Sequence, residues 1–282
     1  LEEGSLGDGG ALVFEEFGAD LIPMLRARTV VRRMGARSIP MNSGTLTLSR
    51  QTSGGTAAYV GEGSNITMSQ QGTGQLTLLA RKLAALVPVS NDLLRDASIP
   101  SDIFVMEDLT NVTVLKEDVT FIRGTGSQNE PTGILHLVSA ANKFNANGTV
   151  NLANVTADLT KAVRLVDESD APMINPGWLM EPRTLWYLMA LQTTTGAFAF
   201  RDELTAGRLF GYPFATTSQI PTNLGGGSDE SEIYFVDFSE CIIGENTAIE
   251  IDVFREAAYH DGSTVQSAVS QDQTIIRLIE RH

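Results

Sequence analysis

The sequence has few residues of the types that carry catalysis, metal binding or covalent cross-links. Its 282 residues include one cysteine, three histidines and four lysines. The single Cys241 excludes an intramolecular disulfide and a thiolate zinc cluster, and we expect it to be a small buried hydrophobe. His136, His260 and His282 match neither a zinc-hydrolase nor a serine-hydrolase motif. The sequence therefore predicts no enzyme, no catalytic, metal-binding or cofactor-binding residue, and no cofactor.

Basic charge and long apolar runs are also scarce. Twenty Lys and Arg stand against 34 Asp and Glu, so the net charge is −14. This balance argues against the basic surface of a sequence-reading nucleic-acid binder. The chain has no apolar run of the roughly 18 residues that a membrane span needs. With 42% hydrophobic and 7% aromatic residues, it should be globular, with about two domains or one large domain with projections.

Two segments near the N-terminus contain too few apolar residues to form a core. Residues 1–40 carry six acidic and then five basic side chains, with glycines at the start. They indicate an extended arm, either a strap on a neighbouring subunit or a solvated terminus. Residues 41–75 hold seven glycines and eleven Ser or Thr. Alternation at residues 45–49 and 66–69 predicts a long two-stranded hairpin that pairs with another chain, the alternatives being a disordered loop or a sheet within the core.

The rest of the chain alternates helices and strands. A strand at residues 83–89 precedes a long helix with Ser101 or Asp102 as N-cap, ended by glycines from Gly124 onward. Apolar residues spaced by three and four predict its buried face: Val105, Leu109, Val112, Leu115, Val119 and Ile122. Later we expect a helix capped by Thr156, a strand at 178–180, a helix from Pro182 through Leu191, an exposed loop at 225–229, and strands at 233–236, 241–244, 248–254 and 274–279. This order predicts an α+β or α/β architecture.

Three other features suggest a site but have simpler interpretations. The glycine-rich loop at residues 124–133 follows a helix and contains no lysine, which excludes a phosphate cradle of the usual kind. Acidic pairs such as Glu107 and Asp108 indicate solvated faces. The aromatic residues Trp178, Trp186 and Tyr187 indicate core packing rather than a base-stacking platform.

Four segments in order resemble the major capsid proteins of tailed bacteriophages of the Hong Kong ninety-seven type. The segments are Phe121-Ile122-Arg123-Gly124-Thr125-Gly126 with the following Asn129-Glu130-Pro131-Thr132-Gly133, then Gly177-Trp178-Leu179-Met180-Glu181-Pro182, Leu209-Phe210-Gly211-Tyr212-Pro213-Phe214, and Phe235-Val236-Asp237-Phe238 with residues 249–255. The resemblance covers nearly the whole chain and implies an α+β capsid fold.

The resemblance implies a division of the chain and a set of partners. Residues 1–40 become an N-terminal arm, 41–79 an extended hairpin loop, 80–144 a peripheral domain with its spine helix at 102–123, 145–244 an axial domain, and 245–282 the return strands. The implied function is a structural shell protein that assembles as hexamers and pentamers into an icosahedral virion head around double-stranded DNA. The implied partners are a portal, a scaffold, a maturation protease and a cement protein, with non-specific contact to DNA and no membrane. Leu1 is then the end that a maturation protease leaves, the alternative being the end of an artificially trimmed chain.

One departure from the family concerns cross-linking. Some members join subunits by an isopeptide bond between a hairpin lysine and a C-terminal asparagine, assisted by a carboxylate. Here residues 41–75 contain no lysine, and Asp272 and Ile279 occupy the positions of the asparagine and the carboxylate. We therefore expect a non-covalent shell. The alternative function is a bacterial encapsulin compartment, which uses the same fold, and an enzyme is the third.

Overall fold

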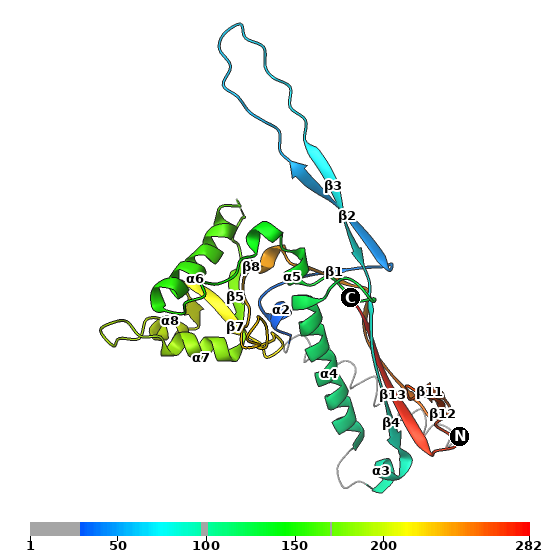
Figure 1. Ribbon diagram of the computed structural model, residues 1–282. Coiled ribbons are helices and arrows are strands. Elements are labelled where there is room, and N and C mark those ends of the chain that lie inside the picture. Colours follow the sequence, from blue (N-terminus) through cyan, green and yellow to red (C-terminus); the bar gives the residue numbers. More distant parts are fainter. Residues whose placement is uncertain (1–28, 97–100, 170) are drawn as a thin grey trace.

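The chain folds into an elongated α+β structure with one long projection (Figure 1). The computed structural model describes residues 29–96, 101–169 and 171–282. Most of the predicted arm, residues 1–28, therefore lies outside the described residues. No helix within the described parts is long and apolar enough to cross a bilayer.

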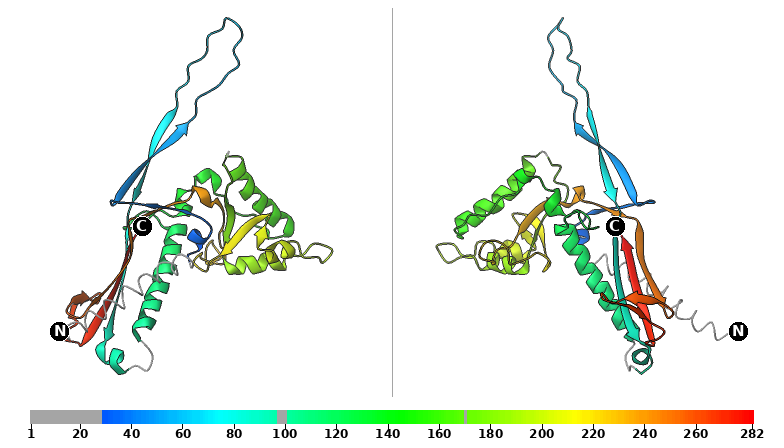
Figure 2. Two further views of the ribbon diagram at one scale, coloured as in Figure 1. Left: turned by 180° about the vertical axis from the view of Figure 1, so that it is seen from behind. Right: turned by 45° about the vertical axis from the view of Figure 1, so that its right-hand side comes forward.

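The elongated part combines a three-stranded antiparallel sheet with one long helix. The sheet has the order β10-β13-β4, and its strands are β4 (Lys82–Ser90), β10 (Thr247–Phe254) and β13 (Gln273–Arg281). The helix α4 (Ser101–Arg123) runs alongside this sheet in both views of Figure 2. Leu109 of α4 packs with Val89, Ile276 and Leu278 of the sheet. At the far end lie α3 (Asn91–Asp96) and the small hairpin of β11 (Ala258–His260) and β12 (Val265–Ser267).

The second part is a four-stranded sheet with helices packed against it. The sheet order is β6-β7-β5-β8, and the strands are β5 (Pro176–Met180), β6 (Arg208–Leu209), β7 (Tyr212–Thr216) and β8 (Ile233–Asp237). The helices are α6 (Leu152–Asp167), α7 (Pro182–Ala190) and α8 (Arg201–Thr205). Trp178 at the centre is fully buried, and its indole Nε1 donates to the carbonyl oxygen of Leu209 at 2.9 Å. A buried aromatic with a satisfied polar atom anchors this core.

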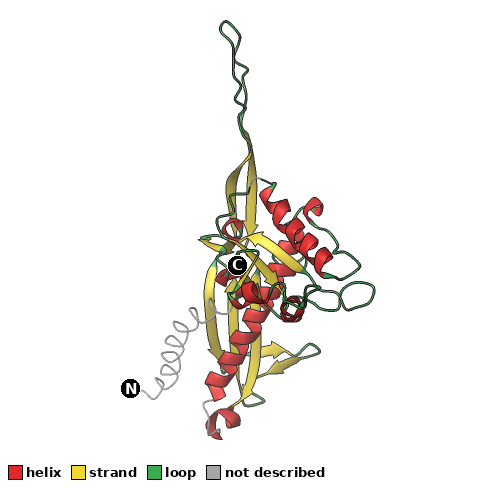
Figure 3. Ribbon diagram, turned by 90° about the vertical axis from the view of Figure 1, so that its left-hand side faces the viewer, coloured by secondary structure: helices red, strands yellow, loops and turns green. Residues whose placement is uncertain are grey.

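The projection is an antiparallel hairpin of β2 (Thr45–Ser53) and β3 (Gly72–Leu79). Figure 3 shows it extending away from the rest of the molecule, with residues beyond the two strands forming a long loop. The predicted hairpin is thus confirmed, but its second strand is not where the alternation at residues 66–69 placed it. That stretch belongs to the loop, because short alternation without a paired neighbour does not specify a strand.

The end of the predicted arm is part of the folded core, which corrects the expectation that residues 1–40 form no core. The short helix α2 (Val30–Arg33) buries Val30 and Val31 among Ile122, Leu179 and other core residues. The following β1 (Arg37–Pro40) pairs in parallel with β9 (Ile242–Glu245). Two valines suffice to anchor this segment because the rest of the chain supplies the pocket.

Most predicted elements are confirmed, with two corrections. The expected strands at 83–89, 178–180, 233–236, 241–244, 248–254 and 274–279 and the helix from Pro182 are present within a few residues. The helix expected to begin at Thr156 begins at Leu152, because the side chain of Asn151 accepts a hydrogen bond from the Asn154 N–H and caps it.

The second correction concerns the buried face of α4. Val112 and Leu115, which the apolar spacing assigned to the interior, are 51% and 46% exposed. Leu109 and Ile122 are buried as predicted, but the interior face also carries five buried polar residues: Thr110, Thr113, Glu117, Asp118 and Thr120. Each threonine hydroxyl donates to the carbonyl oxygen four residues earlier, at 2.7 or 2.8 Å. A threonine satisfied by its own helix can be buried without an external partner.

The glycine-rich loop after α4 closes tightly on the end of the helix. The Gly133 N–H donates to the Gly124 carbonyl oxygen at 2.8 Å. A Cβ at Gly133 would lie 2.5 Å from the Gly124 nitrogen, so only glycine allows this approach. The loop is therefore a structural closure of α4. The remaining short helices are α5 (Ile134–Leu137), η1 (Ala140–Asn142) and η2 (Phe238–Glu240).

Candidate functional site

The described residues contain no catalytic arrangement of a nucleophile and a base. His136 is exposed on α5, and Nδ1 of His260 accepts from the Gly262 N–H in a turn at 3.0 Å. Burial raises the pKa of Cys241 to about 11, with the negative charges of Asp237 and Glu240 adding to it. The thiol is thus neutral and weakly nucleophilic at neutral pH. Cys241 packs against the core cluster around Ile122 as predicted, but it is only partly buried.

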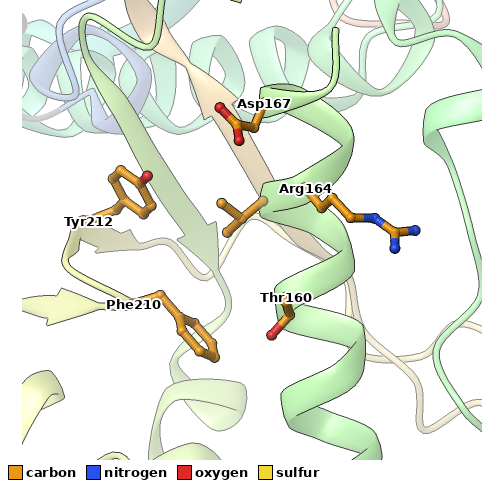
Figure 4. Close-up of a pocket in the computed structure, with 6 residues that line it drawn as sticks. Thr160, Arg164, Asp167, Phe210 and Tyr212 are labelled. Carbon is orange, nitrogen blue, oxygen red and sulfur yellow. The ribbon is translucent and has the colours of Figure 1, made fainter.

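Figure 4 shows a hollow beside α6. It has a volume of about 350 Å³ and lies between α6 and the β6–β7 turn, lined by Thr160, Val163, Arg164, Asp167, Phe210 and Tyr212. Figure 4 shows Arg164 directed away from it, and this side chain pairs with Glu168 at 3.3 Å on the exposed face of the helix. Its lining offers no positioned nucleophile or general base.

Exposed apolar side chains gather instead at the hairpin tip. The loop between β2 and β3 presents Tyr59, Ile66 and Met68, all more than 80% exposed. Within the chain the loop is held by few contacts, among them hydrogen bonds between Ser69 Oγ and the backbone N–H and carbonyl of Thr56 at 3.0 and 3.2 Å. Large apolar groups so far from the core gain no burial from this chain's own fold. The tip is therefore a candidate contact surface for another chain.

A second exposed apolar group lies on α7. Trp186 is 68% exposed and Tyr187 is 43% exposed, so the expectation that they pack in the core is wrong. Only Trp178 of the three predicted core aromatics is buried. The short α7 buries Leu188 on its inner face, and its other side faces outward. An aromatic with a polar atom on such a face is typical of a contact surface.

A largely buried group of charged side chains lies where four chain segments meet: α2, α4, β9 and the end of β13. It begins where α2 meets α4: the Val30 N–H donates to both carboxylate oxygens of Asp118, at 2.9 and 3.2 Å. Burial raises the pKa of Asp118 to about 6, although the backbone N–H groups of Val30 and Val31 lower it. The carboxylate acts as the N-terminal cap that α2 lacks in its own sequence.

Arg32 is the centre of this junction. Its Nε and Nη2 donate to Oε1 of Glu117 at 2.9 and 2.8 Å, and its Nη1 donates to Glu245. The side chains of Arg32 and Glu117 are 8% and 0% exposed, and Glu280 lies 3.9 Å from Nη2. Burial alone would lower the pKa of Arg32, but the two carboxylates raise it above its ordinary value. We name this group, Arg32, Glu117, Glu245, Glu280 and His282, the charged junction.

Burial shifts the pKa values of Glu117 and His282 in the directions that favour their neutral forms. Burial raises the pKa of Glu117, and the pairing with Arg32 opposes that rise. Burial, and then the charge of Arg32, lower the pKa of His282 to about 4. The imidazole ring packs edge-on against Phe121 with ring centroids 4.8 Å apart. His282 is therefore a neutral imidazole at neutral pH.

Sequence reasoning missed the charged junction. Its members are separated by up to 250 positions. The docking of α2 on α4, the pairing of β1 with β9 and the pairing of β13 with β4 and β10 bring them together. The sequence offered no local signal for it, because Glu117 falls outside the apolar spacing that predicted the buried face of the helix.

Comparison with known proteins gives a consistent set of relatives. The model of the phage capsid family matches residues 9–282. The major capsid protein of Klebsiella oxytoca phage phiKO2 is 36% identical over 281 residues, which cover 98% of this chain and 65% of that protein. The capsid polyprotein of Pseudomonas phage PAJU2 is 24% identical over 287 residues, which cover 97% of this chain and 41% of that protein. The chain thus spans less than two thirds of the length of either relative.

Solved structures show the same fold. A chain from Mycobacterium phage Cain superposes with a TM-score of 0.73 at 20% identity, covering 90% of this chain and 82% of that one. A chain from the capsid of a native GTA particle superposes with a TM-score of 0.66 at 18% identity, covering 88% of this chain and 83% of that one. At these identities the likeness concerns the fold.

Proposed function

The chain belongs to the phage capsid family, and from this premise we propose that it is the subunit that builds the shell of a bacteriophage head. In this proposal it assembles as hexamers and pentamers into an icosahedral shell around double-stranded DNA, and its location is the virion. The named relatives are phage and GTA capsids, which favours this function over an encapsulin compartment.

The observation that carries the proposal is the apolar surface that the single chain leaves uncovered. Among the described residues, large apolar side chains lie exposed on the projecting hairpin, at Tyr59, Ile66 and Met68, and on α7, at Trp186 and Tyr187. Burial of these surfaces against other copies would supply the hydrophobic free energy that holds a shell together.

We further propose the division of labour that the family resemblance implies. Residues 1–40 act as the arm, 41–79 as the hairpin that reaches a neighbour, 80–144 with 245–282 as the peripheral domain, and 145–244 as the axial domain at ring centres. The three helices and the four-stranded sheet around Trp178 fit the last role because α7 presents Trp186 outward.

The role is structural rather than enzymatic, and the partners are proteins and DNA. A portal, a scaffold, a maturation protease and a cement protein are the expected partners, with non-specific contact to DNA. A net charge of −14 supplies no counterion release to drive tight DNA binding. Because the hairpin holds no lysine, the shell is non-covalent, and boiled mature particles should give only the 30.3 kDa band on a denaturing gel.

Shortening the hairpin tests the proposal. Residues 54–71 are replaced by a two-residue Asn-Gly turn, which keeps the paired strands β2 and β3. We expect the variant subunit to fold with an unchanged circular dichroism spectrum and to form no closed shells by electron microscopy. Shells of normal size and thermal stability from this variant would contradict the proposed role of the hairpin.

A further inference from the structure

Three members of the charged junction bring metal-ligating atoms together inside one chain. They are Glu117 of α4, Glu280 of β13 and His282 directly after β13. One ligand atom from each lies within 4.8 Å of the other two, and all three residues are buried. We propose that Glu117, Glu280 and His282 bind one divalent cation of the first transition-metal row, such as Zn²⁺ or Mn²⁺.

Two of these side chains hold a buried acceptor atom that has no hydrogen-bond partner. Glu117 is 0% exposed, and while its Oε1 accepts from Arg32, its Oε2 accepts no hydrogen bond. His282 is 7% exposed, and its Nδ1 is likewise without a hydrogen-bond partner. Leaving a buried acceptor unsatisfied costs about 1–3 kcal/mol. A cation between them satisfies the carboxylate and the imidazole at once.

The donor set selects the class of cation. Two carboxylates and one imidazole suit zinc or manganese, whereas calcium and magnesium prefer oxygen ligands alone. Ligands at about 2.0–2.2 Å from the cation lie roughly 3–4 Å apart. The observed spread of up to 4.8 Å therefore requires side-chain movements of about 1 Å.

Arg32 decides how strongly the cation is held. Its guanidinium binds Oε1 of Glu117, so the second oxygen of the same carboxylate remains available to the cation. Its positive charge opposes a second cation nearby, and we therefore expect a weaker site than one made by ligands without such a neighbour. The bound cation joins α4 to the end of β13. It acts as a coordinate link within the subunit and is independent of the proposed shell function.

The test measures metal binding to the purified, unassembled full-length chain after dialysis against a chelator. Co²⁺ is titrated as the spectroscopic probe, with Zn²⁺ as competitor, from micromolar to millimolar concentration. We expect one Co²⁺ per chain, visible d–d absorption bands, displacement by Zn²⁺ and a higher melting temperature with Zn²⁺. X-ray absorption of the zinc form of the wild-type chain should show a single imidazole ligand.

Three variants distinguish binding at this site from binding at the surface. His282→Ala should weaken Co²⁺ binding by at least about 10–100-fold, since even the loss of an outer partner of a ligand has that effect. His136→Ala, which removes an exposed histidine, should bind as the wild type does. Glu117→Gln, with its fold checked by circular dichroism, should also lose the bands.

Three results would overturn the site. They are a wild-type chain without d–d bands or a zinc-dependent melting shift, an X-ray absorption spectrum without an imidazole ligand, and His282→Ala binding with wild-type affinity. None of them bears on shell formation, which the hairpin deletion tests separately.

Discussion

The hairpin tip and the charged junction are both poor in ordinary apolar core residues, yet they complete their interactions in opposite ways. In the junction, Arg32 binds Glu117 and Glu245, which lie on segments far away in the same chain. In the tip, Tyr59, Ile66 and Met68 lie exposed beyond the last paired residues of β2 and β3. A segment with few apolar core residues can therefore be either a contact surface for other copies or part of the chain's own interior, and its composition alone does not distinguish the two.

Removing the central charge of the junction should have the largest effect. Arg32→Ala leaves Glu117 buried without its partner, and we expect the free energy of unfolding of the unassembled subunit to fall by about 3–5 kcal/mol. Urea unfolding followed by circular dichroism measures it. The matched control is Arg50→Ala on the exposed hairpin, with a change within about 0.5 kcal/mol. If Arg32→Ala and Arg50→Ala lowered the free energy of unfolding equally, the proposed difference between the charged junction and the hairpin would be wrong.

The two tryptophans allow the same comparison of a buried with an exposed side chain, here for large aromatic groups. Trp178→Ala should lower the free energy of unfolding by about 3–5 kcal/mol, because Trp178 is fully buried. Trp186→Ala should change it by less than about 0.5 kcal/mol, because its side chain is largely exposed. We expect the second variant to assemble poorly, as judged by the yield of closed particles. A stability loss at Trp186 matching that at Trp178 would show that its surface is internal.

Asp237 carries a buried carboxylate that, unlike those of the junction, accepts hydrogen bonds mainly from backbone N–H groups. Its oxygens accept from the backbone N–H groups of Ile174, Asn175 and Ser239 at 3.0 Å. Burial tends to raise the pKa of Asp237, but the hydrogen bonds from Ser239 and the other donors outweigh it and hold the pKa below its ordinary value. Asp237→Asn should therefore cost about 1–3 kcal/mol at pH 7.

The sign of the pH dependence follows from the lowered pKa. The stabilisation is fully present above the unfolded-state pKa of about 3.9 and is lost as the pH falls through the folded-state pKa. The difference between wild type and Asp237→Asn should thus shrink in urea unfolding at pH 3. Glu240→Gln, at a nearby exposed carboxylate, serves as the control and should stay close to wild type. A difference that grows on acidification would contradict this assignment.

The hairpin tip should show the smallest effect on the subunit itself. The double substitution Tyr59→Ser and Met68→Ser should change the free energy of unfolding by less than about 0.5 kcal/mol, because neither side chain is buried. The yield of closed shells should fall, because the proposed contact with a neighbour loses its apolar groups. Ser64→Ala at the same tip should assemble normally. Full shell yield from the double variant would place the contact elsewhere.

Local patterns in the sequence predicted the elements whose structure depends on nearby residues. Pro182 begins α7 because a proline is tolerated in the first turn, and Trp178 lies in a buried strand as its apolar neighbours indicated. The glycine and serine-rich stretch predicted the hairpin, since such residues cannot fill a core. The resemblance in four motifs then placed these elements in the phage capsid family, which the family match confirms.

Other features were decided by tertiary structure alone. The apolar spacing in α4 could not reveal that Val112 is exposed while Glu117 is buried. The partner that allows Glu117 to be buried, Arg32, comes from a distant part of the chain. Trp186 carries the same local pattern as a core residue and is exposed. Charges from positions 32, 117, 245 and 280 meet only after the strands have paired. Local sequence determines which elements form, but the energy of a buried charge depends on partners brought from elsewhere in the chain, and only the folded structure specifies those partners.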